Sequence, residues 1–346
     1  MLLYNCGKEN TSEKGRLSIR KAKYPKMIDI LVTPPVNEKH RALLESACPG
    51  GRFRYIPYAD VKREDVEAAA VIIGNVPREF LKGADKLHLL HLNTAGADGY
   101  PEAMPERAIL TNSSGAYGLA ISEHMLGMLL AVKKKLYLYW NDQKDCLWRD
   151  EGGVSSIEDA VVLSVGMGDI GGEFLRKCKA LGAYTIGVRR TPRAKPDFAD
   201  ELYTLDAIDE LLPRADVVAL SLPSGPATNG LMDERRLRLM KRGAVLINVG
   251  RGSAVDTDAL VSVCSEGLIR AALDVTDPEP LPAEHPLWHT PNAYITPHIS
   301  GFFHLPQTLD RIVAIGAENL KRIVAGEPLL NAVDASTGYR REEGRA

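Results

Sequence analysis

The sequence has few cysteines, and none of them is spaced for a metal site or a disulfide framework. The cysteines are odd in number, five in all, widely separated and without a CxxC pair: Cys6, Cys48, Cys146, Cys178 and Cys264. This pattern disfavours structural zinc and disulfides, and it favours a reducing compartment such as the cytoplasm. Histidines and acids also lack ligand spacings such as HExxH, so we expect no bound metal.

Long apolar runs and a net charge of one sign are missing as well. No apolar run approaches the roughly 20 residues needed to cross a bilayer, so we expect no membrane partner. The 43 lysines and arginines nearly balance 45 acidic residues, which gives no basis for a nucleic-acid partner. Residues 1–26 are basic and unpatterned, which predicts a disordered extension, and residues 335–346 are expected to form a frayed tail.

What the sequence does contain is two series of short apolar strands that alternate with helical patterns. A chain of 346 residues is long enough for two domains. The first series runs from Ile28 to about Asn112, and the second begins at Ala160. A long helix is expected between them, from about Gly118 to Tyr139, and another over Leu305–Ala325. Such alternation is typical of parallel sheets covered by helices.

The order of these segments predicts an α/β fold with two doubly wound parallel-sheet domains. The second series lies in the middle of the chain, so its partner domain must use sequence on both sides of it. We expect a flavodoxin-like substrate domain over residues 27–115 and 303–334, interrupted by a Rossmann-type dinucleotide-binding domain over residues 116–302. A ligand-binding cleft is then expected between the two domains.

A glycine-rich turn follows the predicted strand Ala160–Val165. Its sequence is Gly166-Met167-Gly168-Asp169-Ile170-Gly171, in the order strand, GxGxxG, helix, strand. The first glycine permits the tight turn, the second lets backbone approach a pyrophosphate, and the third lets the helix pack close to the strand. The helix N-terminus adds N–H groups and partial positive charge. Glycine turns are common, but this context predicts a dinucleotide site.

Basic residues follow the second strand of this unit. An NAD site usually carries an acidic residue here, which hydrogen-bonds the ribose 2′-OH. This sequence has Arg189, Arg190 and Thr191 instead. Guanidinium groups offer charge and forked donors to a 2′-phosphate. We therefore expect NADP(H) to be preferred and NAD(H) to be possible, the alternative being a solvated basic turn.

Three predicted loops carry an arginine, a glutamate and a histidine. Arg251 lies in the segment NVGRG, Glu279 in LDVTDPEP and His298 in TPHISG. Reduction of a 2-oxo acid needs such a set, because a guanidinium can bind the carboxylate and polarise the carbonyl. An imidazolium can deliver the proton, and a carboxylate can keep it charged and oriented. The alternatives are a surface ion pair for the arginine, a solvated turn for the glutamate and a structural role for the histidine.

The glycine motif and these three segments, in this order, resemble the D-isomer-specific 2-hydroxyacid dehydrogenase family over Ile28 to Val333. The resemblance implies catalytic roles for Arg251, Glu279 and His298. It also implies that Thr94, Ala95 and Gly96 bind the substrate carboxylate, together with Arg251 and His298. Asp274 matches the residue that bonds the nicotinamide amide. The other implied cofactor contacts are Leu222, Pro223, Thr228, Val249, Gly250 and Gly301.

Two positions depart from the family pattern. Arg189 replaces the acidic ribose ligand, as in the NADP-dependent glyoxylate and hydroxypyruvate reductases, and Thr276-Asp277 replaces the usual aromatic and acid. The sequence thus predicts an NADPH-preferring reductase that converts glyoxylate, hydroxypyruvate or a similar small 2-oxo acid to the D-2-hydroxy acid. The resemblance implies a homodimer through the cofactor domains, with Tyr137–Trp148 either as the interface arm or as an exposed amphipathic loop. Two alternatives stay open: a dehydrogenase of a larger acid such as phosphoglycerate, and a cofactor-sensing binding protein.

Overall fold

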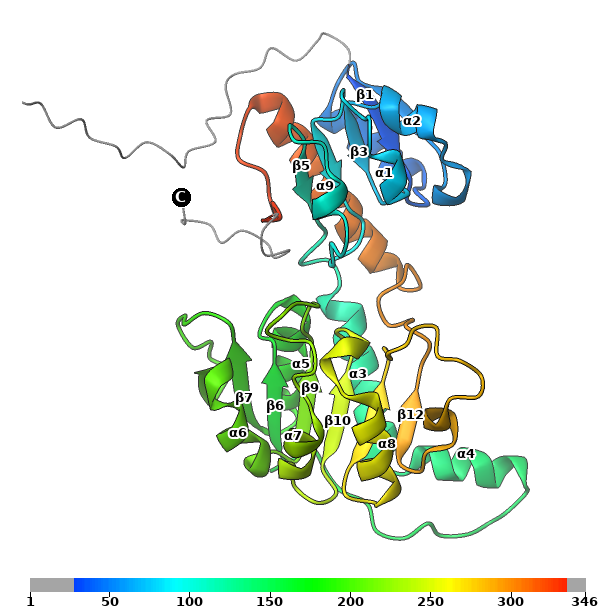
Figure 1. Ribbon diagram of the computed structural model, residues 1–346, viewed down its shortest axis with the longest axis vertical. Helices are drawn as coiled ribbons and strands as arrows, with labels where there is room; N and C mark the ends of the chain where they lie inside the picture. Colours follow the sequence, from blue (N-terminus) through cyan, green and yellow to red (C-terminus); the bar gives the residue numbers. More distant parts are fainter. Residues whose placement is uncertain (1–27, 335–346) are drawn as a thin grey trace, which may run out of the picture.

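The computed structural model describes residues 28–334, which form two lobes connected by two crossings of the chain (Figure 1). One lobe contains a five-stranded sheet and the other a seven-stranded sheet. All neighbouring strands in both sheets are parallel, so the predicted α/β fold with two parallel-sheet domains is confirmed. The extension expected at residues 1–26 and the tail expected at 335–346 lie outside the described residues.

The smaller sheet has the strand order β2-β1-β3-β4-β5, which is the flavodoxin-like order. Apolar clusters lie on both of its faces, as in other parallel sheets that are covered on both sides. Its strands are β1 (Asp29–Val32), β2 (Arg52–Tyr55), β3 (Val71–Ile73), β4 (Leu89–His91) and β5 (Ile109–Thr111). Its helices are α1 (Glu38–Ala47), α2 (Arg63–Ala68) and α9 (Pro306–Ala325), with the 3₁₀ turns η1 (Tyr58–Asp60), η2 (Arg78–Phe80) and η3 (Pro101–Ala103).

The larger sheet has the strand order β12-β11-β10-β9-β6-β7-β8. Counted from β6, this is the 3-2-1-4-5-6 order of dinucleotide-binding sheets with one further strand, β12, at the edge. Its strands are β6 (Val161–Val165), β7 (Tyr184–Arg189), β8 (Glu201–Thr204), β9 (Val217–Leu220), β10 (Val245–Asn248), β11 (Arg270–Leu273) and β12 (Ala293–Ile295). Its helices are α3 (Gly118–Lys133), α4 (Leu136–Lys144), α5 (Asp169–Ala180), α6 (Ile208–Leu211), α7 (Glu234–Leu239) and α8 (Thr257–Ser265), with η4 (Leu205–Ala207), η5 (Leu212–Arg214), η6 (Gly252–Ala254) and η7 (Pro286–His289).

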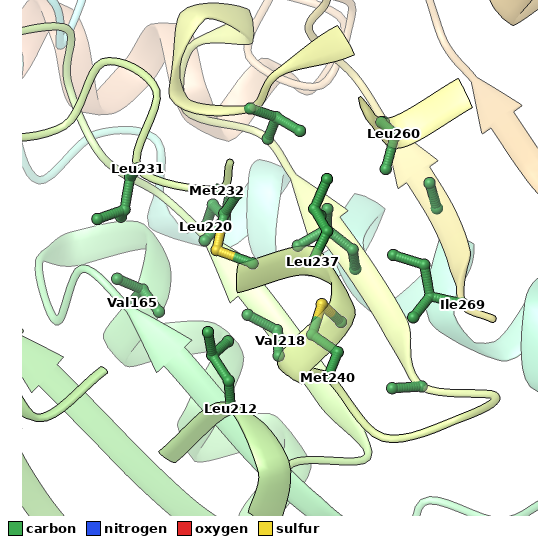
Figure 2. Close-up of a cluster of buried hydrophobic side chains, with 14 of the residues drawn as sticks. Val165, Leu212, Val218, Leu220, Leu231, Met232, Leu237, Met240, Leu260 and Ile269 are labelled. Atoms are coloured by element: carbon green, nitrogen blue, oxygen red, sulfur yellow. The ribbon is translucent and has the colours of Figure 1, made fainter. Parts of the chain in front are cut away.

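Apolar side chains fill both faces of the larger sheet. Figure 2 shows one cluster, in which Val165, Val218 and Leu220 of the sheet pack with Leu237 of α7 and Leu260 of α8. Each of these side chains is at most 1% exposed. Burial of apolar surface, at about 25 cal/mol per Å², is the main stabilising contribution to such a core. The packed sheet fixes the strand ends from which the loops described below begin.

The last helix, α9, returns to the smaller sheet, as the sequence predicts. Val313 and Leu320 lie in one buried cluster with Ile30 and Ile73. Ile312 instead packs with the core of the larger sheet, so α9 begins at the junction of the lobes. The expected boundaries at residues 115/116 and 302/303 fall between β5 and α3 and between β12 and α9. They stay predictions.

Two elements differ from what the sequence indicates. The long helix expected from Gly118 to Tyr139 is wrong: α3 ends at Lys133 and α4 begins at Leu136. Lys135 lies between them with a φ of +56°, a left-handed conformation that cannot continue a right-handed helix. The strand β8 was not expected, because this short edge strand is partly exposed and lacks a continuous apolar run.

Two kinds of feature are absent from residues 28–334. None of the helices there combines the length and apolar character that crossing a membrane requires. Nor does that part of the chain bring three or more His, Cys, Asp or Glu side chains together in a way that could hold a metal ion.

Candidate active site

The glycine-rich turn lies where the strand order of the larger sheet reverses, between β6 and β9. Gly166 has a φ of +107°, and a Cβ there would lie 2.8 Å from the Ser221 carbonyl oxygen. The Ser221 hydroxyl donates to the Gly166 carbonyl at 2.8 Å. The carboxyl ends of strands at such a reversal form the crevice in which open α/β sheets bind ligands.

The second and third glycines of the turn have different surroundings. A Cβ at Gly168 would meet no described atom within 4 Å, so the backbone there is open to a ligand. A Cβ at Gly171 would lie 2.0 Å from the Gly166 carbonyl oxygen, because α5 packs directly on the turn. The N–H groups at the start of α5, including those of Asp169 and Ile170, have no acceptor within the helix. This arrangement suits a phosphate.

The basic residues predicted to bind the cofactor follow β7, beside this turn. The N–H groups of Gly166 and Met167 both donate to the Val188 carbonyl, at 3.0 and 3.1 Å. Arg189 is the next residue and ends β7, and it is followed by exposed Arg190 and by Thr191. This strand end is where sheets of this type bind the adenosine ribose.

The loop after β9 forms the opposite side of the crevice. Thr228 is 4% exposed, and its hydroxyl contacts the carbonyls of Pro223 and Gly225 at 2.7 and 3.1 Å. Gly250 lies against this loop, because a Cβ there would be 2.5 Å from the Leu222 carbonyl oxygen. The structure therefore places five predicted cofactor residues on this side: Leu222, Pro223, Thr228, Val249 and Gly250.

The start of α3 closes the crevice near the junction of the lobes. The Asp169 carboxylate accepts a hydrogen bond from the Gly118 N–H at 2.7 Å, so this side chain holds α3 in place. A Cβ at Gly301 would lie 3.5 Å from the Tyr117 ring. The Tyr117 hydroxyl donates to the Asn93 carbonyl of the smaller lobe. Predicted cofactor residues and the interlobe contact thus meet at Tyr117 and Gly118, where α3 begins.

His298 and Glu279 are brought together after β11 and β12. Nδ1 of the imidazole contacts Oε1 of the carboxylate directly. A carboxylate can only accept, so Nδ1 carries a hydrogen and Nε2 is the atom that can exchange a proton with a ligand. His298 has a φ of +52°, which is uncommon for a residue with a side chain. Both side chains are about half exposed, which gives a ligand access to them.

The Asp274 carboxylate lies beneath the loop that carries His298 and is 1% exposed. One oxygen accepts from the Thr296 hydroxyl at 2.6 Å and from the Ile299 N–H at 3.0 Å. The other accepts from the N–H and the hydroxyl of Ser300, at 3.0 and 2.5 Å. These donors lie on both sides of His298, so they fix the loop. The predicted contact from Asp274 to the nicotinamide amide stays a prediction.

Arg251 reaches from the larger lobe to the smaller one. Its Nη2 and Nε donate to Oδ2 of Asp98, at 2.6 and 3.1 Å. A Cβ at Gly252 would lie 1.9 Å from the Thr276 carbonyl oxygen, so the segment behind the arginine packs against the segment that carries Glu279. The loops of the predicted catalytic residues therefore begin at the carboxyl ends of neighbouring strands, on the side of the sheet that faces the smaller lobe.

The loop predicted to bind the substrate carboxylate lies under the guanidinium of Arg251. The Thr94 hydroxyl donates to the Gly96 carbonyl at 2.7 Å, and the Asn112 amide donates to the Ala95 carbonyl at 2.7 Å. A Cβ at Gly96 would lie 2.0 Å from Nη2 of Arg251. Only a residue without a side chain permits so close an approach.

Sequence reasoning missed the partner of the arginine and a cavity near the histidine. Asp98 is the acidic residue of the segment Asn93–Asp98, and that isolated charge among small residues was the available signal. The cavity, of about 440 Å³, lies between α3 and the segment after His298. Its lining residues are Ala120, Glu123, His124, Ile299, Ser300, Phe302, His304 and Leu305.

Together these features define a two-lobed α/β protein with a dinucleotide-binding crevice and with an arginine, a glutamate and a histidine at the cleft. The sequence model described as "D-isomer specific 2-hydroxyacid dehydrogenase, NAD binding domain" matches residues 126–300. The chain belongs to the D-isomer specific 2-hydroxyacid dehydrogenase family.

Solved structures of family members are similar over nearly the whole chain. A family protein from Aeromonas salmonicida is 31% identical, with a TM-score of 0.80, covering 89% of this chain and 99% of its own. A family protein from Xanthobacter autotrophicus, solved in complex with NADPH and MES, is 28% identical with a TM-score of 0.76. That similarity covers 90% of this chain and 99% of the other.

Relatives of assigned activity fall into more than one class. A glyoxylate reductase from Thermofilum pendens is 30% identical over 275 residues, covering 74% of this chain and 78% of its own. A D-3-phosphoglycerate dehydrogenase from Methanocaldococcus jannaschii is 29% identical over 318 residues, covering 89% of this chain. The chain spans only 60% of the length of that dehydrogenase. Family membership therefore gives an NAD(P)-dependent oxidoreductase without a particular substrate.

Proposed function

We propose that the protein reduces a small 2-oxo acid, with glyoxylate or hydroxypyruvate as the first candidates, to the 2-hydroxy acid, which has the D configuration wherever C2 is a stereocentre. NADPH is the preferred coenzyme in this proposal. The main support is the contact between His298 and Glu279. These two residues lie at the carboxyl ends of the strands of the larger sheet, as do Arg251 and the glycine-rich turn. Similarity to a curated glyoxylate reductase and to a family structure with bound NADPH supports it.

The residues around the glycine-rich turn fit a dinucleotide. The open backbone at Gly168 and the start of α5 suit the pyrophosphate. The positions of Arg189, Arg190 and Thr191 at the end of β7 suit a ribose 2′-phosphate. The bound coenzyme would supply a hydride to C2 of the substrate. NAD(H) is the alternative coenzyme.

The side chains at the cleft account for the rest of the reaction. The N–H groups of Ala95 and Gly96 bind the substrate carboxylate, and Arg251 binds the carboxylate and the carbonyl oxygen. Arg251 thereby stabilises the negative charge that develops on that oxygen. Nε2 of His298 delivers a proton to the same oxygen, while Glu279 on Nδ1 stabilises the imidazolium.

We further propose a homodimer formed through the larger lobes, with Tyr137–Trp148 as the contact arm. In Figure 1, α4 lies at the far end of the larger lobe, away from the smaller one. The arm exposes several large apolar side chains, including Trp140, Leu147 and fully exposed Trp148, which is typical of a contact surface. Light scattering is expected to give the mass of two chains, and the mass of one chain would contradict the proposal.

We also propose a cytoplasmic location, because the wide spacing of the cysteines favours a reducing compartment.

A dehydrogenase of a larger D-2-hydroxy acid is the second candidate, which the similarity to D-3-phosphoglycerate dehydrogenases favours. The test is a panel of 2-oxo acids of increasing size, each assayed with NADPH and with NADH. The proposal predicts the highest kcat/KM for glyoxylate or hydroxypyruvate with NADPH. A preference for phosphohydroxypyruvate would replace the substrate assignment. Coenzyme binding without turnover of any acid would favour a cofactor-sensing binding protein.

A further inference from the structure

The ion pair between Arg251 and Asp98 joins the two lobes at the candidate site. Nη2 and Nε of the guanidinium both donate to a single carboxylate oxygen, at 2.6 and 3.1 Å. Nη1 donates to the Gly250 carbonyl at 2.8 Å. The arginine and aspartate side chains are 31% and 48% exposed, so solvent screening makes the pair a weak source of stability. A contribution to stability therefore does not account for the geometry of this ion pair.

The guanidinium keeps donors for a further acceptor. It carries five N–H hydrogens, of which Asp98 takes two and the Gly250 carbonyl takes one. One hydrogen on each terminal nitrogen is left by this count. A 2-oxo acid presents carboxylate and carbonyl oxygens side by side, and two neighbouring N–H donors match that pair.

The absence of a side chain at Gly96 allows the guanidinium of Arg251 to lie close to the loop predicted to bind the substrate carboxylate. A Cβ at Gly96 would be 2.0 Å from Nη2 of Arg251 and 2.9 Å from Oδ2 of Asp98. Both charged groups therefore lie directly over the loop predicted to bind the substrate carboxylate. A free arginine side chain samples many rotamers, and two hydrogen bonds to one carboxylate remove most of that freedom.

We propose that Asp98 is a positioning residue for Arg251. It holds the guanidinium by one edge over Gly96 and leaves the terminal nitrogens to the 2-oxo acid. The inference rests on the proposed function of Arg251. Asp98 also places a negative charge near an anionic substrate, but both side chains are partly exposed and solvent screens that repulsion. Misplacement of a binding group by about 1 Å can cost a factor of 100 in rate, so positioning outweighs repulsion.

A double-mutant cycle tests this role. In the wild-type background, Asp98→Ala is expected to raise KM for the 2-oxo acid, lower kcat and reduce kcat/KM by about 30-fold or more. The dissociation constant for NADPH is expected to stay unchanged. Asp98→Asn keeps an acceptor oxygen and should recover part of the loss. In an Arg251→Lys background, Asp98→Ala should change kcat/KM less than about threefold. Glu327→Ala, an exposed acid beyond α9, is the matched control.

An unchanged kcat/KM in Asp98→Ala, or an equal loss in both backgrounds, would overturn the inference. Failure of the proposed function would look different, because the wild-type protein would then turn over no 2-oxo acid. In that case the same cycle is applied to the dissociation constant of oxalate, a two-carboxylate probe, measured by calorimetry with NADP⁺ present. The inference predicts that the effects of the two substitutions on oxalate binding are non-additive. Additive effects, or no oxalate binding at all, would contradict it.

Discussion

Residue 96 lies directly against the guanidinium of Arg251, so any side chain there must displace that group. We expect Gly96→Ala to displace the guanidinium of Arg251, since its Cβ would lie 2.0 Å from Nη2. The variant should lose at least 10-fold in kcat/KM while its unfolding temperature stays close to that of the wild type, because the displaced group is partly exposed. Gly127→Ala is the control: Gly127 is exposed in α3, with nothing within 4 Å of its Cβ. Equal kcat/KM values for the two variants would be evidence against this geometry.

We also expect a single residue, Arg189, to set the proposed preference for NADPH. We expect Arg189→Asp to raise KM for NADPH by at least 10-fold, because a carboxylate repels the 2′-phosphate. KM for NADH should change little, since an acid at this place can accept from the 2′-OH. Arg193→Asp makes the same charge change four residues further along and should have a smaller effect. A preference for NADPH that survives Arg189→Asp would contradict the assignment.

The catalytic residues that the sequence predicts lie in short motifs that follow strand ends. Arg251, Glu279 and His298 each follow a predicted strand, so parallel pairing brings their loops to one edge. Asp98 was missed because its partner is more than 150 positions away in the sequence and in the other lobe. No local pattern reports such a contact.

At the scale of the elements, the contact between α5 and β6 depends on one glycine. A Cβ at Gly171 would lie 2.0 Å from the Gly166 carbonyl oxygen and 2.7 Å from the Ser164 hydroxyl oxygen. Backbone cannot yield cheaply, so we expect Gly171→Ala to destabilise the protein by about 1–3 kcal/mol, measured by urea unfolding. Gly172→Ala is the matched control in the same helix, with only a Phe198 ring carbon at 3.8 Å. Equal midpoints for the two variants would contradict this packing.

Most helices and strands could be predicted from the sequence because their apolar residues repeat with a regular period. The break at Lys135 could not, because apolar residues continue on both sides of the left-handed position. β8 was missed because its side chains are partly exposed and mostly polar, so no run of apolar residues marks it. The period of the apolar residues indicates which side chains are buried. It does not indicate a left-handed residue between two helices or an exposed edge strand.

At the scale of the whole molecule, we expect buried His91 to make the free energy of unfolding depend on pH. It is fully buried among β4, β5 and α9, near Thr111, Ser113 and Asn319. Burial lowers its pKa from 6.5 to about 4. Between these values the unfolded chain binds a proton that the folded protein excludes. The contribution of His91 to the free energy of unfolding is therefore complete above pH 6.5. It is lost as pH falls toward 4, and the free energy of unfolding then falls by up to about 1.4 kcal/mol per pH unit.

The corresponding measurement is the unfolding free energy of wild type and His91→Gln between pH 4.5 and 6.5. We expect the slope with pH to be smaller in His91→Gln. His289→Gln, an exposed histidine on the larger lobe, should keep the wild-type slope. A His91→Gln slope identical to that of the wild type would show that this residue does not couple folding to pH.

We propose that the two lobes together direct a hydride to C2 of a 2-oxo acid. The most direct measurement follows deuterium into the product from NADPH that carries deuterium at both C4 positions of the nicotinamide, by NMR of the isolated acid. We expect deuterium at C2 of the 2-hydroxy acid with the wild-type protein, and at least 100-fold slower transfer in Arg251→Ala and His298→Ala. Undiminished transfer in both variants, or no deuterium in any hydroxy acid, would contradict it.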